Sequence, residues 1–145
     1  MNKKIFQSIG AFMAGLVATF VLSYATDAVL EQIGVLPSGS LPMNGSELLI
    51  ITILVYRNIY NVVGSFVAAS LAPSNPMRHA LALGVFGFVM MVLVTIATWN
   101  MALGPAWYSL TLIVFAFPSA WLGGKLRLRF ETRTSYLDAP VPDAK

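Results

Sequence analysis

Long apolar runs separated by short polar segments are the dominant pattern along this chain. The runs cover residues 5–33, 47–72, 77–99 and 106–124. Each is close to or longer than the roughly 20 residues that an α-helix needs to cross the hydrocarbon layer of a bilayer. The pattern therefore predicts an all-α fold, an integral membrane four-helix bundle, with residues 1–127 forming a single four-span transmembrane domain.

Turn-forming residues separate the predicted helices. Glycine, proline, serine and asparagine crowd residues 34–46, which predicts a loop, and Ser46 is a suitable N-cap for the second helix. The sequence Pro-Ser-Asn-Pro at residues 73–76 predicts a tight connection between the second and third helices. A glycine pair, Gly123-Gly124, ends the fourth run, and the polar residues 128–145 are predicted to form a mobile cytoplasmic tail.

The first run also has features of a secretory signal. It has a basic start, an apolar centre, and small residues around Ser23 and Ala25 that fit a cleavage site. However, the helical pattern continues past this point and stops only at Gly34. We therefore expect an uncleaved first span that is tilted or protrudes from the bilayer.

Basic residues gather on one side of the predicted bundle. With four spans, eight of the nine lysine and arginine residues fall on that side: Lys3, Lys4, Arg78, Lys125, Arg127, Arg129, Arg133 and Lys145. Positively charged segments stay in the cytoplasm. The sequence thus predicts a bacterial inner (plasma) membrane protein, N-in/C-in, with both termini cytoplasmic. The same clustering accounts for the net charge of +3, so the lipid bilayer is the expected partner and nucleic acid is not.

The composition supports a membrane protein and argues against several kinds of site. Hydrophobic residues make up 57% of the chain and charged residues only 10%, compared with about 25% charged in soluble domains. With no cysteine and a single histidine, disulfides, thiolate sites and a multi-histidine metal site within one subunit are excluded. We find no phosphate-binding loop, nucleophile elbow or serine–base pair. The sequence therefore predicts no cofactor and no enzymatic activity.

Arg57 is the one basic residue that does not lie beside the predicted spans on the cytoplasmic side. It lies inside the second apolar run. At 1.5 Å per residue it lies about 15 Å from the start of that run and farther from its end. An arginine at such a depth costs roughly 2.5–3.5 kcal/mol on insertion scales. We therefore expect its side chain to face protein or water and to have a partner.

The second helix carries its polar and small residues on one narrow stripe: Arg57, Tyr60, Asn61, Gly64 and Ala68. The four-residue spacing of the last two is typical of close helix packing. The first helix offers Asp27 roughly 9 Å below its outer end, within reach of an extended Arg57. We predict an intramembrane Arg57–Asp27 pair. Three side chains are expected to add hydrogen bonds around it: Tyr24, Tyr60 and Asn61.

Three roles for this pair remain open. It could fix the register of the helices, because a lone charge left in the membrane is strongly unfavourable. It could leave Arg57 partly neutralised in an anion or headgroup site that opens outward. It could also relay protons through Asp27.

Aromatic residues cluster at the turn between the third and fourth helices. They are Trp99, Trp107 and Tyr108. Tryptophan and tyrosine are enriched where membrane meets water, so these three are predicted to be interface anchors.

Several short motifs stand in order between Tyr56 and Arg127: Tyr56-Arg57, Gly64, Leu71-Ala72-Pro73, Pro76-Met77-Arg78-His79-Ala80, Leu83-Gly84, Gly104-Pro105-Ala106-Trp107-Tyr108 and Pro118-Ser119-Ala120-Trp121-Leu122-Gly123-Gly124-Lys125-Leu126. Through them the chain resembles a group of uncharacterised small four-helix bacterial inner-membrane proteins. It departs from their pattern at Ser65, where they often have glycine, and at Ser70, where they often have a basic residue. The resemblance implies a four-helix membrane architecture and no particular activity.

Small size and little mass outside the predicted spans favour a non-catalytic role. Our leading hypothesis is an accessory, assembly or interaction subunit that docks its apolar helix faces against itself or a larger membrane complex. The alternative is a small-solute or ion transporter. It would act as a homo-oligomer, because four helices enclose little room for a pathway.

Overall fold

The computed structural model describes residues 3–36, 46–101 and 104–137. Within these ranges the chain is entirely helical and turn, without strands: α1 (Lys3–Gln32), α2 (Glu47–Leu71), α3 (Pro76–Thr98), the short 3-10 helix η1 (Trp99–Met101) and α4 (Ala106–Leu137). Each of the four α-helices is long and apolar enough to cross a membrane. The all-α prediction with four membrane-length helices is confirmed.

The helix ends follow from local chemistry at the positions that the sequence indicated. Ser46 caps α2, and its side chain accepts a hydrogen bond from the Leu49 backbone N–H. Asn75 adopts a left-handed conformation (φ 50°) just before α3, and Pro76 is the first residue of that helix. Proline suits this position because the first N–H groups of a helix have no partner within it.

The fourth helix is longer than predicted. It continues through the glycine pair and through residues 128–137, where we had expected a mobile tail, and ends at Leu137. The reason is that neither proline nor glycine occurs between Lys125 and Leu137 to stop it. Residues 138–145, the rest of the predicted tail, lie outside the described part of the chain.

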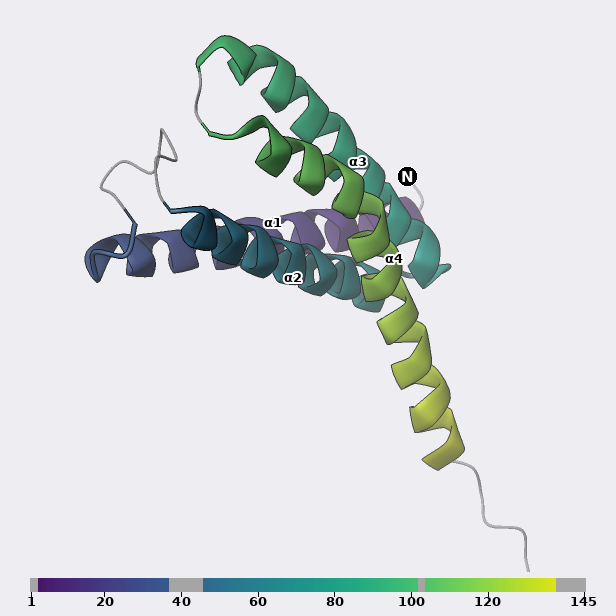
Figure 1. Cartoon of the computed structure of the whole chain (residues 1–145). Helices are drawn as coiled ribbons and strands as arrows, with labels where there is room; N and C mark the ends of the chain where they lie inside the picture. The colour runs from purple at the N-terminus through teal and green to yellow at the C-terminus, as the bar shows by residue number, and fades with distance from the viewer. Residues whose placement is uncertain (1–2, 37–45, 102–103, 138–145) are drawn as a thin grey trace, which may run out of the picture.

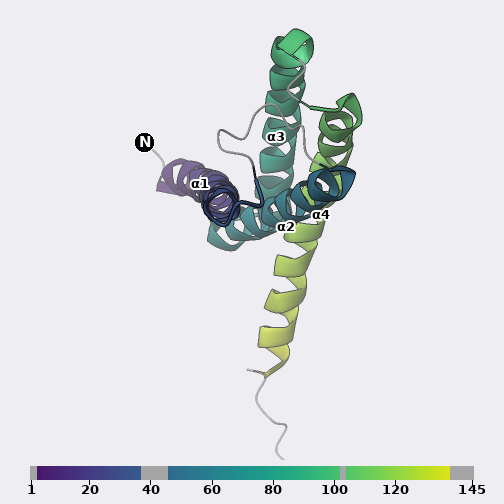
Figure 2. The same ribbon diagram turned by 60° about the vertical axis from the view of Figure 1, so that its left-hand side comes forward.

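Helix α2 is the centre of the structure, because it makes extensive contact with each of the other three α-helices. α1 and α2 run antiparallel and side by side, and α3 and α4 form a second antiparallel pair that diverges from them toward the α3–α4 turn (Figures 1 and 2). Within the described residues the backbone of α1 approaches that of α3 over a short stretch and does not come close to that of α4. The two helix pairs are therefore joined mainly through α2.

Small residues allow these helices to approach closely. Gly64 and Ala68, predicted as packing positions, are both buried, and Gly64 faces α1 at Gly15 and Thr19. On another side of α2, a Cβ added at Gly123 of α4 would lie 2.5 Å from the Val62 carbonyl oxygen. The glycine that was expected to mark the end of the fourth span is thus a contact between α2 and α4.

An apolar cluster joins the first half of α2 to the start of α4. Its buried members are Leu36, Ile50, Ile53, Tyr108 and Leu112. Tyr108 is only 6% exposed, so the structure corrects its assignment as an interface anchor. Successive residues of a helix point about 100° apart, and so Trp107 remains partly exposed while Tyr108 turns toward α2. Trp99, the third predicted anchor, is 60% exposed.

Candidate functional site

The predicted charged residues lie together between α1 and α2. Arg57 donates a hydrogen bond from Nη2 to Asp27 Oδ2 at 2.9 Å, and this contact is also an ion pair. Both side chains are largely covered, with 32% exposure for Arg57 and 23% for Asp27. The geometry links the two helices by a charge-assisted hydrogen bond, which is stronger than one between neutral groups.

Tyr56 completes the coordination of the carboxylate. Its hydroxyl donates to Asp27 Oδ1, so each carboxylate oxygen accepts a hydrogen bond from α2. Sequence reasoning missed Tyr56 because it lies off the polar stripe, one residue before Arg57. Tyr60, which was on the stripe, shares a 2.7 Å hydrogen bond with Thr26 of α1, and its ring lies against that of Tyr56.

Tyr24 does not belong to this cluster. Its side chain is 78% exposed and has no hydrogen bond within the described residues. Ser23 faces the interior of the bundle, and the next residue along a helix is rotated by about 100°. The prediction that Tyr24 supports the pair is therefore wrong, because proximity in sequence and depth does not determine the side of the helix.

The far side of Arg57 faces α4. Arg57 and Tyr108 are close enough to interact electrostatically. Arg57 Nε and the Tyr108 hydroxyl are both buried, and neither has a hydrogen-bond partner among the described residues. Arg57 thus forms an ion pair with Asp27 of α1. Its contact with Tyr108 of α4 does not include a hydrogen bond.

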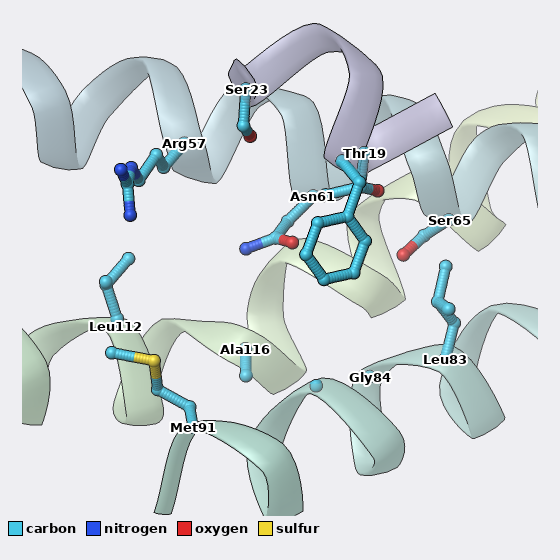
Figure 3. Close-up of a pocket in the computed structure, with 12 residues that line it drawn as sticks. Thr19, Ser23, Arg57, Asn61, Ser65, Leu83, Gly84, Met91, Leu112 and Ala116 are labelled. Carbon is cyan, nitrogen blue, oxygen red and sulfur yellow. The ribbon is translucent and has the colours of Figure 1, made fainter. Parts of the chain in front are cut away.

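A cavity of about 230 Å³ adjoins the arginine where the two helix pairs diverge (Figure 3). Its polar wall comes from α1 and α2: Thr19, Ser23, Arg57, Asn61 and Ser65. Across from them, α3 and α4 contribute apolar side chains that include Leu83, Met91, Leu112 and Ala116. Asn61, predicted to support the ion pair, instead points into this cavity.

The polar wall is rich in groups that are free to bind a molecule in the cavity. Thr19 uses its hydroxyl within the protein, donating to the Gly15 carbonyl oxygen at 3.0 Å. Ser23, Asn61 and Ser65 have no hydrogen-bond partner in the described ranges. Because Arg57, Asn61 and Ser65 recur every four residues along α2, they form a ladder of donors down one wall.

A hydrogen bond outside this cavity adds a further link to α4. Ser119 Oγ donates to Asn58 Oδ1 at 3.2 Å, and the Asn58 amide donates to the Leu54 carbonyl oxygen at 2.8 Å. The signal in the sequence was Asn58 itself, a polar residue inside an apolar run. It was missed because Asn58 does not lie on the polar stripe that contains Arg57.

No group of three or more histidine, cysteine, aspartate or glutamate side chains in residues 3–36, 46–101 and 104–137 could hold a metal ion.

A scan against protein-family models, a search of curated proteins and a search of solved structures found no match.

Proposed function

We propose that this chain spans a bacterial inner membrane four times, with both termini in the cytoplasm. Support comes from the four apolar helices and from the position of the basic residues. Lys3 and Lys4 begin α1, Arg78 lies in the first turn of α3, and the other described basic residues outside Arg57 follow the apolar part of α4. In a four-span topology these segments share one side, which the positive-inside rule assigns to the cytoplasm.

Within that membrane, the proposed role is a non-catalytic accessory, assembly or interaction subunit of a membrane complex. The observation that carries this proposal is the small fraction of helix residues that is buried inside the protein. In the most apolar window of α1, only 11% of residues are buried inside the protein. Large side chains such as Phe6, Met13 and Val17 are exposed along it, leaving a wide face for lipid or for a neighbouring transmembrane helix.

Site-specific crosslinking distinguishes whether the exposed face of α1 contacts lipid or a neighbouring transmembrane helix. A photoactivatable residue at Val17, which is 52% exposed, should give crosslinks to a partner protein or to a second copy in intact membranes. The same residue at Ile53, which is 1% exposed, is the matched control and should give none. Crosslinks to lipid alone at Val17, together with a lone monomer after purification in mild detergent, would contradict the proposal.

A small-solute or ion transporter, acting as a homo-oligomer, is the second candidate. The polar cavity beside Arg57 favours it, because a pathway needs hydrogen-bonding groups inside the bundle. Reconstitution into liposomes tests this candidate: flux of the solute should fall when Arg57 or Asp27 is replaced. A survey of small ions and polar solutes without any flux that depends on both residues would remove it.

A further inference from the structure

The cavity beside Arg57 has an exposed rim halfway along the helices. Phe20 of α1 and Gly87 of α3 line the cavity, Phe20 is 67% exposed, and Gly87 is exposed as well. A Cβ added at Gly87 would meet nothing within 4 Å. Gly87 is the middle residue of α3. In a chain that spans the bilayer, this rim therefore opens toward the hydrocarbon layer and not toward either aqueous side.

The inner wall of the cavity contains polar groups that need a partner. Ser65 is only 2% exposed, and its hydroxyl points into the cavity without a hydrogen-bond partner in the described part of the chain (Figure 3). The Asn61 side chain points the same way and is equally unpartnered. Leaving such groups unsatisfied away from water is unfavourable in an apolar setting. A bound molecule that accepts hydrogen bonds removes this cost.

Charge limits which molecule fits. The positive charge of Arg57 is balanced by Asp27 at 2.9 Å, and no other charged side chain among the described residues lines the cavity. An anion bound here would add an uncompensated charge at a depth where charges are weakly solvated. A neutral molecule with oxygen acceptors satisfies Asn61 and Ser65 without that penalty.

Size limits the part of the molecule that enters. A cavity of 150 Å³ holds benzene, and this one measures about 230 Å³. One substituted ring fits, with its apolar face against Leu112 and Met91 of the opposite wall. A longer apolar tail has no room inside and must leave through the rim.

We propose that this cavity binds an uncharged, membrane-dissolved molecule whose head is about one ring in size and carries carbonyl oxygens. The carbonyls accept hydrogen bonds from the Asn61 and Ser65 side chains, and the apolar tail leaves between Phe20 and Gly87 into the lipid. The proposal rests on a membrane-spanning chain, but it holds for an accessory subunit and for a transporter alike.

Binding to the purified full-length chain in lipid nanodiscs tests this, with titration calorimetry as the readout. The probe is a benzoquinone that carries a decyl chain. Decylbenzene has the same tail and ring size without acceptors, and decyl phosphate replaces the neutral head by an anion. We expect saturable binding of the quinone, and binding of the other two at least tenfold weaker.

Variants locate the site. Ser65→Ala keeps the Cβ that packs against α4, and loss of one hydrogen bond of about 1 kcal/mol should weaken quinone binding roughly fivefold. Gly87→Leu should abolish binding by filling the rim. Gly10→Leu is its matched control, because Gly10 is also open to added atoms but lies away from the cavity, and it should bind like the wild type.

Four results would overturn the proposal. Equal binding of decylbenzene would show that hydrogen bonding is irrelevant, and tighter binding of decyl phosphate would show an anion site. No saturable binding of the quinone would mean that the cavity does not take such a molecule. Identical behaviour of the Gly87 and Gly10 variants, with unchanged helix content and thermal unfolding, would place the ligand elsewhere. None of these results depends on whether a partner protein or a transported solute is found.

Discussion

Gly15 of α1 and Gly64 of α2 face each other so closely that neither has room for a side chain. A Cβ added at Gly15 would lie 2.5 Å from the Gly64 carbonyl oxygen, and one added at Gly64 would lie 2.7 Å from the Gly15 carbonyl oxygen. Both obstacles are backbone atoms, which cannot rotate away as side chains do. The pair therefore sets the distance between the two helices.

Gly64→Ala should destabilise the protein by about 1–3 kcal/mol, because the helices must move apart to admit the methyl group. The free energy of unfolding in mixed micelles, titrated with a denaturing detergent, measures the loss. Gly10→Ala is the matched control, since nothing lies within 4 Å of its added Cβ. Equal stability of the two variants would show that α1 and α2 do not pack at Gly64.

Replacing either Arg57 or Asp27 by leucine should reduce stability by about 2 kcal/mol, in line with the loss of a hydrogen bond to a charged group. The exchanged double variant, Arg57→Asp with Asp27→Arg, should be more stable than the summed losses of Arg57→Asp and Asp27→Arg alone predict if the two side chains act directly on each other. The same detergent titration provides the readout. A double variant no more stable than the sum of its single changes predicts would argue against direct pairing.

Two tyrosines of similar size should respond differently to loss of the hydroxyl group. Tyr56→Phe removes a hydrogen bond to Asp27 and should cost about 1 kcal/mol. Tyr108→Phe removes a buried hydroxyl without a hydrogen-bond partner among the described residues, so its stability should be unchanged or slightly higher. A clear loss for Tyr108→Phe would mean that its hydroxyl is satisfied in the membrane, with Arg57 as the nearby candidate.

Topology is open to a direct assay. A reporter that is active only in the cytoplasm should be active when fused after Arg129, whereas fusion after Gly104 should silence it. A second reporter, active only outside the cytoplasm, should give the opposite pattern and controls for expression. Activity of the external reporter after Arg129 would overturn the proposed orientation.

The positions of the helices could be read from the sequence because strong local signals mark them. Ser46 caps α2 and Pro76 is the first residue of α3, as their residue types indicated. The Arg57–Asp27 contact was also predictable, since the cost of a charge in an apolar run demands a partner and depth leaves one good choice. In each case a single constraint, local or energetic, decides the structural outcome.

The sequence did not reveal the rotation of each helix about its axis, which decides which side chains face the interior. Tyr24 and Tyr108 were placed by depth and neighbourhood, but the packing of α1 and α4 against α2 turns the first outward and the second inward. Gly123 was interpreted as an end signal because nothing local distinguishes a terminating glycine from a packing glycine. The cavity combines side chains from four helices, and no single stretch encodes it.

The central position of α2 has a consequence for biosynthesis. α2 emerges from the ribosome before α4, yet the hydrogen-bond partner of Asn58 is Ser119, and the close neighbour of Ser65 is Gly123. Until α4 is inserted, this side of α2 presents polar groups to lipid or to the insertion machinery. The final helix thus completes the shielding of the second one, and a nascent chain that stops before residue 119 leaves Asn58 without its partner on α4.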